Sequence, residues 1–412
     1  MHRNPLWVAT ITVLLSLADY AFTQTWTQTS APTNSWSAVA ASADTTRLVA
    51  VAGDAFGSVV GGIYLSTNSG STWIQTSAPS NVWTAVASSA DGTKLVAAAS
   101  RTSQQGPIYT STDGGQSWIS NNLAPNTWRS VACSADGSRI FAETTFGDLL
   151  ITTNSGGLWT SSPAPGGTWA ITCSPDGTTV LAGGGNSSAS TCVSTNSGLT
   201  WTTNHLSFWR PWSVAMSADG KKLRAVDGVG NPEGLIYTST NFGTTWEAIN
   251  SPRGVWQTIA SSADGTKLIA AAWKNTAFWS GPIYTSVDAG LTWVSNNLPV
   301  KSWRSVACSA DGSTFIAVTE RSDISSTDLG NGSIWISKTA PEPRLNLASS
   351  SNRITLSWMT TSTNFGLQQI LDLSTNHWTD VTNAPVLNLT NLHTEVFLPT
   401  PAGNTFYRLE TR

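Results

Sequence analysis

Apolar and polar residues alternate with a period of two in short runs along most of this chain. Typical runs read "WTAVAS", "KLVAAA", "IYTST" and "WIQTS". Such alternation is typical of half-buried strands, and Gly and Asx turns separate the runs. The pattern therefore predicts an all-β protein built from units of four short antiparallel strands.

The runs recur as a repeat. Strings related to "WTAVASSADGTKLVA" begin 41 to 47 residues apart, at Trp36, Trp83, Trp128, Trp169, Trp212, Trp256 and Trp303. A period of this size indicates a solenoid or a propeller, and four strands repeated radially form a propeller blade. We therefore expect a seven-bladed β-propeller, with each "SADG" string forming the turn between the first two strands.

A second string, Ser/Thr-x-Asn/Asp-x-Gly-x-x-Trp, occurs six times, as in "STNSGSTW" and "STDGGQSW". Its Asn or Asp is expected to accept hydrogen bonds from the turn backbone, and its Gly to adopt a conformation that a Cβ opposes. The predicted acceptors are Asn68, Asp113, Asn154, Asn196, Asn241 and Asp288.

This string resembles the Asp-box (BNR) repeat of sialidase-like propellers, which is also seen in sortilin-type receptors, xyloglucan hydrolases and photosystem II assembly factors. The resemblance covers about Gln24 to Ser337. It implies a structural hairpin between the third and fourth strands, on the face away from the ligand. Four of the six acceptors are Asn, which a structural turn tolerates and a catalytic carboxylate would not.

The N-terminal string "TWTQTSAPTNSW" matches the internal string "TWIQTSAPSNVW". The last unit ends at "SIWISK", before a fourth strand of its own. We therefore predict that the strand around Trp26 completes the last blade and closes the ring. On this interpretation seven Trp residues open first strands and seven follow hairpins.

Outside the repeat, the chain predicts three further segments. Residues 1–23, with "MHR" and "LWVATITVLLSLA", have the layout of a secretory signal peptide. Residues 24–338 are the expected propeller and 339–344 a linker. Residues 345–412 read as short strands that resemble the small β-sandwich module appended to exported bacterial proteins. A secreted or extracytoplasmic protein, with cell-surface association as an option, is the expectation.

Composition and isolated motifs exclude several functions. Charged residues make up 11% of the chain and the net charge is -3, which does not suit nucleic-acid binding. The four His have no ligand spacing and no glycine-rich phosphate loop appears, so we expect no metal or cofactor. Cys133, Cys173 and Cys308 occupy a repeat position that also accepts Ser, Ala and Met, which favours four buried thiols, Cys192 included, over disulfides.

Two classes of function remain open. Sialidase chemistry is disfavoured, because the first unit lacks an Arg-Ile-Pro string and four of the six Tyr share one packed position. A glycan-processing hydrolase needs two carboxylates across a cleft. The acids outside the "SADG" and hairpin turns are expected to be solvated loop residues; they include Asp54, Glu143, Asp148, Asp227, Glu233, Glu320, Asp323 and Asp328.

The links between second and third strands vary in length and chemistry, and strand topology places them on one face. Variable loops on a rigid scaffold are where binding usually occurs. Two links stand out, "WKNTAFWSGP" and "ERSD", with candidate ligand-binding residues Trp273, Trp279, Glu320 and Arg321. The competing interpretation is that these aromatics pack a long loop. We expect a non-catalytic module that binds a glycan or an extracellular protein, with the hydrolase as the alternative.

Overall fold

The computed structural model describes most of the chain from residue 24 onward. The described ranges are 24–53, 59–100, 105–121, 123–164, 169–184, 190–205, 211–228, 234–273, 281–320, 332–339, 345–350, 353–359, 365–371, 377–390, 392–401 and 405–411. All regular elements in these ranges are strands, so the predicted all-β class is confirmed.

From residue 24 to 338 the described residues form seven four-stranded antiparallel sheets. The first strands of the sheets are β2 (Trp36–Ala41), β6 (Trp83–Ser88), β10 (Trp128–Cys133), β14 (Ala170–Cys173), β18 (Pro211–Met216), β22 (Val255–Ser261) and β26 (Trp303–Cys308). The second strands are β3 (Leu48–Gly53), β7 (Leu95–Ala99), β11 (Ile140–Thr144), β15 (Val180–Gly183), β19 (Leu223–Asp227), β23 (Leu268–Trp273) and β27 (Thr314–Thr319).

The outer strands are shorter. The third strands are β4 (Val60–Ser66), β8 (Ile108–Ser111), β12 (Leu149–Thr152), β16 (Ser190–Ser194), β20 (Ile236–Ser239), β24 (Ile283–Ser286) and β28 (Ile334–Lys338). The fourth strands are β5 (Ile74–Gln75), β9 (Ile119–Ser120), β13 (Trp159–Ser162), β17 (Thr202–His205), β21 (Glu247–Ala248), β25 (Val294–Ser295) and, from the start of the chain, β1 (Trp26–Gln28).

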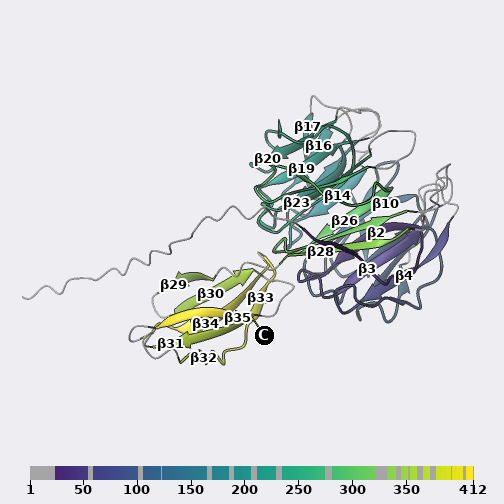
Figure 1. Cartoon of the computed structure of the whole chain (residues 1–412). Helices are drawn as coiled ribbons and strands as arrows, with labels where there is room; N and C mark the ends of the chain where they lie inside the picture. The colour runs from purple at the N-terminus through teal and green to yellow at the C-terminus, as the bar shows by residue number, and fades with distance from the viewer. Residues whose placement is uncertain are drawn as a thin grey trace, which may run out of the picture.

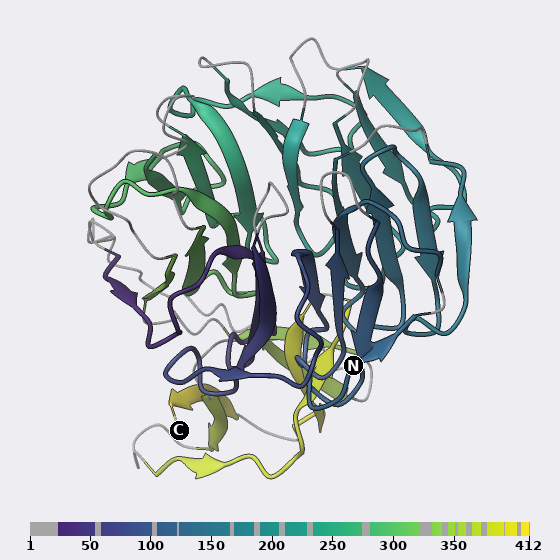
Figure 2. The ribbon, with the colours of Figure 1, turned by 90° about the vertical axis from the view of Figure 1, so that its right-hand side faces the viewer.

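The first strands surround a common axis. Each contacts the first strand of the next sheet, and β26 of the last sheet contacts β2 of the first, so the contacts form a closed cycle. Figures 1 and 2 show the sheets fanning outward from this centre. Because neighbouring strands are antiparallel, the links between second and third strands lie at one end of the axis. The "SADG" turns and the repeated hairpins lie at the other.

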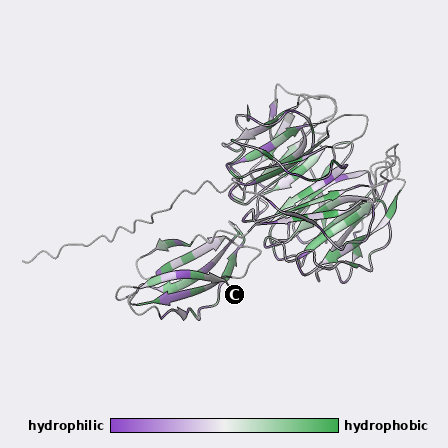
Figure 3. Ribbon diagram, in the orientation of Figure 1, coloured by the Kyte–Doolittle hydropathy of each residue, from purple (hydrophilic) through white to green (hydrophobic). Residues whose placement is uncertain are grey.

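The core is divided among the seams between neighbouring sheets. One seam, for example, packs Val51 and Ile63 of the first sheet against Trp83, Val86 and Ala97 of the second. The seam between the last sheet and the first is built in the same way, with Ile316 and Ile334 against Trp36 and Leu48. Apolar residues gather along the sheets in Figure 3. Small residues such as Ala fit here because each sheet packs on both faces.

The N-terminal strand completes the last sheet, as "TWTQTSAPTNSW" predicts. In β1, Trp26 pairs with Ser337 and Gln28 pairs with Trp335 of β28. The Trp26 indole donates a hydrogen bond to Asn296 Oδ1 at 3.0 Å, which ties the strand to the preceding sheet. The first and last parts of this region are therefore held together by strand pairing as well as by packing.

The "SADG" turns are linked in series by backbone hydrogen bonds. An amide in each turn donates to a carbonyl in the next: Ala43 to Ala90, Ala90 to Ala135, Ala135 to Pro175, Ala218 to Ala263, Ala263 to Ala310, and Ala310 back to Ala43, at 2.6–2.8 Å. The step from the fourth turn to the fifth is missing because Pro175 has no N–H. The bond from Ala310 to Ala43 closes the series across the seam between the last sheet of the ring and the first.

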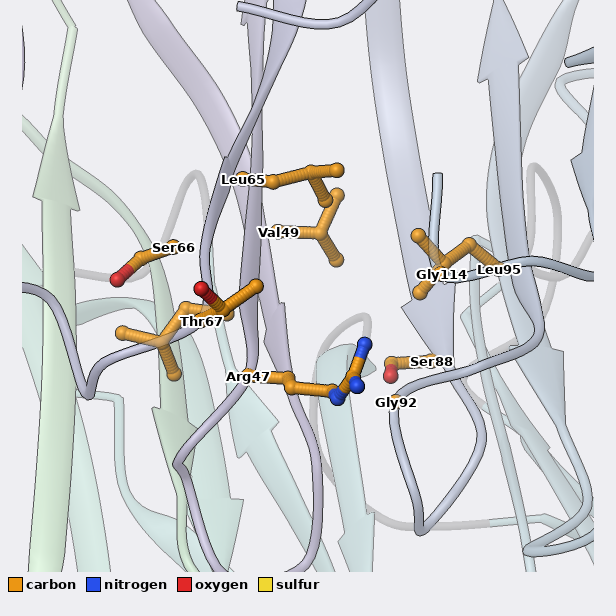
Figure 4. Close-up of a pocket in the computed structure, with 10 residues that line it drawn as sticks. Arg47, Val49, Leu65, Ser66, Thr67, Ser88, Gly92, Leu95 and Gly114 are labelled. Carbon is orange, nitrogen blue, oxygen red and sulfur yellow. The ribbon is translucent and has the colours of Figure 1, made fainter. Parts of the chain in front are cut away.

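Cationic side chains also contact the "SADG" turns of neighbouring sheets. Arg47 extends from the start of β3 to the turn at Gly92 of the next sheet (Figure 4). Gly92 has φ +69°, and a Cβ there would lie 2.7 Å from the Arg47 Cβ, so the turn requires glycine on both conformational and steric grounds. Lys222 and Arg139 reach equivalent turns, where they donate to the carbonyls of Asp264 and Asp176.

Two Trp assignments made from the repeat are wrong by one residue. Pro211 pairs with Asp227 just as Trp128 pairs with Thr144, so Pro211 opens its first strand and Trp212 is the next residue along. Trp169 likewise occupies the place after the strand opening, because Ala170 pairs with Gly183 as Ser130 pairs with Glu143. The sequence alignment matched Trp to Trp, whereas strand register matches Trp169 and Trp212 to Arg129.

The C-terminal residues form two further sheets. One contains, in order, β29 (Asn346–Ser349), β30 (Arg353–Met359), β34 (His393–Pro399) and β33 (Val386–Asn388); the other contains β32 (Thr379–Asp380), β31 (Phe365–Ile370) and β35 (Phe406–Thr411). Leu356, Trp358 and Val396 of the first sheet share a buried cluster with Leu367 of the second. This region therefore has a core of its own.

Replacing Ala310 with proline tests the closing bond of the turn series. Ala310→Pro removes the amide that donates to Ala43 at a position where the equivalent turn already contains a proline. We expect a loss of about 1 kcal/mol, since a buried carbonyl loses its partner while the proline stiffens the unfolded chain. Urea denaturation measures the change. The control Pro175→Ala should stay within about 0.5 kcal/mol of wild type, and an Ala310→Pro protein as stable as wild type would contradict the assigned role.

Candidate binding site at the ring axis

A β-bulge near the start of the first strand sets one residue of each sheet apart. The register between first and second strands shifts after Trp36, Trp83, Trp128, Pro211, Trp256 and Trp303. The extra residues are Ser37, Thr84, Arg129, Trp212, Gln257 and Arg304, and Trp169 holds the equivalent place before β14. A bulged residue has no partner across the ladder, so its side chain is free to turn toward the axis.

The two small bulge residues seal seams. Ser37 Oγ donates to the carbonyl of Trp83 at 2.7 Å, and Thr84 Oγ1 donates to the carbonyl of Trp128 at 3.2 Å. Each hydroxyl thus bonds to the first strand of the next sheet. These two side chains therefore stabilise the contacts between sheets.

The large bulge residues instead converge. The Arg129 guanidinium carbon lies 4.7 Å from the ring centroids of both Trp169 and Trp212. The two indoles meet edge to face at 5.1 Å. Because these three residues come from three successive sheets, they can meet only near the axis, and stacking a cation on an indole face is favourable.

A second arginine approaches from the last sheet. Arg304 Nε lies 3.3 Å from Glu320 Oε2, and Glu320 Oε1 accepts a hydrogen bond from Ser302 Oγ at 3.0 Å. Glu320 directly follows β27, so the group lies at the end of the axis where the second-to-third strand links emerge. We call Arg129, Trp169, Trp212, Arg304 and Glu320 the axial cluster.

The electrostatics of the axial cluster favour an anion. Burial lowers the pKa of Arg129 to about 10, with a further contribution from the Arg304 cation and an opposing one from Glu143. Arg129 remains a cation at neutral pH. Arg304 is paired with Glu320, whereas the Arg129 Nε is buried and has no hydrogen-bond partner within the described part of the chain.

Glu143 pairs with Ser130, the residue after Arg129, and its position corrects the prediction of a solvated loop acid. Glu143 lies in β11 with 0% of its surface exposed. Neither carboxylate oxygen has a hydrogen-bond partner among the described residues, and burial raises its pKa to about 8, against a smaller opposing effect of Arg129. The nearby acid Asp227 is also buried, at the end of β19, whereas Asp148 is exposed as predicted.

The predicted ligand residues are only partly described. Glu320 belongs to the axial cluster, and Trp273 is the last residue of β23, where it pairs with Val255. Trp279 and Arg321 lie outside the described residues, as do Asp54, Glu233, Asp323 and Asp328. The proximity of the four candidates therefore stays a prediction.

The six hairpin acceptors lie at the opposite end of the axis. In each, the Asn or Asp side chain accepts a hydrogen bond from the backbone N–H four residues later; the donors are Thr72, Ser117, Leu158, Thr200, Thr245 and Thr292, at 2.8–3.0 Å. Asn and Asp form the same bond, so the turn needs an acceptor and not a charge.

All four cysteines are free. Cys192 is buried, while Cys133, Cys173 and Cys308 are half-buried, so burial was overestimated for these three. Burial raises the pKa of Cys133 to about 12, which keeps the thiol protonated and unreactive. No cluster of potential metal ligands occurs among the described residues.

Sequence reasoning missed Arg129, Trp169, Trp212 and Arg304. The available signal was the second position of each first strand, which reads Ser, Thr, Arg, Trp, Trp, Gln and Arg while its neighbours hardly change. Aligning Trp with Trp in the fourth and fifth units hid this column. Variation within an otherwise constant repeat marks a position that packing does not fix.

Substituting Glu143 tests its burial through pH. The unfolded chain releases this proton near 4.5 and the folded chain near 8. The folded state therefore binds more protons between these values, and its stability should fall with rising pH by up to about 1.4 kcal/mol per pH unit. Glu143→Gln should flatten this slope in urea denaturation between pH 5 and pH 8, while the control Asp148→Asn, at an exposed position, should keep it. An unchanged slope in Glu143→Gln would contradict the assignment.

The fold resembles that of solved β-propellers. No protein-family model and no curated protein matches the sequence. The chain is similar to YCF48 bound to a D1 peptide, with a TM-score of 0.56 and 16% identity over 81% of this chain and 98% of that one. It is also similar to YCF48 from Cyanidioschyzon merolae, with a TM-score of 0.55 and 15% identity over 76% of this chain and 98% of that one. These likenesses support the β-propeller architecture of the repeated sheets.

Proposed function

We propose that this protein is a non-catalytic binding or assembly factor that holds a segment of a partner protein against the axial cluster. In this proposal residues 24–338 are a seven-bladed propeller with Asp-box hairpins, residues 345–412 are a β-sandwich module, and residues 1–23 direct export. The observation that carries the proposal is the stacking of Arg129 on Trp169 and Trp212. Aromatic and arginine side chains gathered at one point are typical anchors of protein interfaces.

A protein ligand is favoured over a glycan by two observations. In the axial cluster Arg129 lies beside two aromatic rings and has no ion-pair partner within the described part of the chain, and a neutral sugar does not require such a cation. One of the structural neighbours, YCF48, is described bound to a peptide. A glycan stacked on the indoles is the second candidate ligand. No described helix has the length and apolarity to cross a bilayer.

The hydrolase alternative needs two carboxylates that reach one substrate bond. Of the described acids near the axis, Glu143 is fully buried and Glu320 is held by Arg304 and Ser302. These acids are poorly placed to act as a catalytic pair. Binding therefore accounts for the arrangement of the described acids better than hydrolysis does.

Selection from a phage-displayed library of random peptides tests this function. We expect peptides that bind the wild-type protein and lose at least about tenfold in affinity with Trp212→Ala, since such anchors contribute more than about 1.4 kcal/mol. The matched control is Ile119→Ala, which removes an exposed apolar side chain on the outer strand β9. The variants Trp279→Ala and Arg321→Ala extend the test to the predicted loop residues.

Two results would overturn the proposal. One is a selected peptide whose binding depends on Ile119 and not on Trp212. The other is a failure to select any peptide together with specific binding on a glycan array, or turnover in a glycosidase screen, which would favour a glycan ligand or the hydrolase.

A further inference from the structure

We propose that the axial cluster binds one carboxylate of its peptide ligand at the Arg129 guanidinium, and that Glu143 competes with the ligand for this guanidinium. This inference rests on the proposed function. It adds the chemical class of the recognised group and a proton-dependent control of its binding.

The first argument is the set of donors that Arg129 leaves unused. A guanidinium carries five N–H donors in a planar fork. The Arg129 guanidinium carbon lies 4.7 Å from both ring centroids, and because the two indoles stand at 89° to one another, the fork can lie flat on only one of them. No hydrogen bond from Arg129 is found within the described residues, and its Nε is buried. A carboxylate matches the edge of the fork with two parallel hydrogen bonds.

The second argument is the balance of charge. Arg129 and Arg304 are close enough for the second cation to lower the pKa of the first. Glu320 compensates Arg304 at 3.3 Å, which leaves Arg129 without an ion-pair partner among the described residues. Burying a charge without a partner is costly, so one entering anion would neutralise the cluster. A cationic ligand group would add to the repulsion.

The third argument is the position of Glu143, which pairs with Ser130, the residue after Arg129, across the β10–β11 ladder. Of the titratable and charged groups around Glu143, those with a resolved effect are Arg129 of β10 and the thiol of Cys192 of β16, with Arg304 beyond Arg129. The Cys192 thiol has a raised pKa from burial, so it stays neutral over most of the relevant range. When Glu143 is ionised it supplies the counterion that Arg129 otherwise lacks. A negative charge on Glu143 then disfavours a second carboxylate at Arg129.

The direction of the pH effect follows. Below about pH 8 Glu143 is protonated and the Arg129 charge is available to the ligand; above it, Glu143 is ionised and competes. If only the protein with neutral Glu143 binds, the apparent affinity is scaled by the neutral fraction. That fraction falls about tenfold between pH 7 and pH 9 for a pKa of about 8.

The experiment uses the full chain with ¹⁵N-labelled tryptophan. Indole NMR signals of Trp169 and Trp212 are assigned with Trp169→Phe and Trp212→Phe. The probes are Ac-Gly-Glu-Gly-NH₂, its neutral analogue Ac-Gly-Gln-Gly-NH₂, and sodium acetate, at constant ionic strength. We expect saturable shifts of the two signals with the acidic peptide and none with the neutral one. Arg129→Gln should abolish these shifts, and Arg129→Lys, which keeps the charge but not the fork, should weaken binding about tenfold or more.

The pH arm isolates Glu143. The wild-type affinity for the acidic peptide should fall about tenfold from pH 7 to pH 9. In Glu143→Gln it should be the same at both values. The stability of each variant is measured separately by denaturation, which shows whether a loss of binding reflects unfolding. If Arg129→Gln is unfolded, the affinities of folded Arg129→Lys and Glu143→Gln test the proposal instead.

Each other outcome counts against a stated part. Equal shifts with the neutral peptide would overturn carboxylate recognition, and an equal pH response in Glu143→Gln would overturn the competition. Acetate binding as tight as the acidic peptide would assign the site to small acids instead of peptides. Library peptides that bind through Trp212 without an acidic residue would refute this inference and leave the proposed function intact. The absence of any library binder, together with no shift from the acidic tripeptide, would refute the proposed function and this inference with it.

Discussion

Every sheet in the repeated region has two apolar faces, and both are buried only if the ring of sheets closes. An open row would leave one face of the first sheet and one of the last in water. Closure is achieved where the first and last sheets of the repeated region meet: β1 pairs with β28, Ile334 and Ile336 pack against Trp36, and the Ala310 amide donates to the Ala43 carbonyl. The other sheets of the ring depend on this seam, because each sheet is buried on both faces only when the sheets on both sides of it are in place.

The closed ring also explains where variation is possible. Residues between sheets are fixed by packing, and the turns at one end are fixed by the backbone series and by cations such as Arg47. The bulge residue after each strand opening has no ladder partner, and where it is small, at Ser37 and Thr84, it is bonded to the next sheet. The large residues at this position, Arg129, Trp169 and Trp212, meet near the axis. Substituting them changes the chemistry of the centre while the scaffold stays the same.

The axial cluster illustrates the cost of burying charge. Arg304 and Glu320 compensate one another, whereas Arg129 is stabilised by two indole faces and lacks hydrogen-bond partners among the described residues. Glu143 is close enough to affect it but is itself so desolvated that it holds a proton at neutral pH. A scaffold gains little from such an arrangement, because an apolar pair would pack at lower cost. The Arg129 charge, which has no hydrogen-bond partner among the described residues, is the feature on which the proposed binding site rests.

The sequence by itself determined the strand period, the repeat, the hairpin chemistry and the closing strand, because these are local patterns copied many times. "TWTQTSAPTNSW" was sufficient to place Trp26 beside β28, and the Ser/Thr-x-Asn/Asp strings were sufficient to identify the turn acceptors. Tertiary structure alone decided the register of Trp169 and Trp212, the burial of Glu143 and the meeting of Arg129 with the two indoles. A one-residue bulge and the convergence of distant sheets leave no period in the chain. They exist only once strands are paired and the ring has closed. The scaffold could therefore be predicted from the sequence, whereas the axial cluster could not.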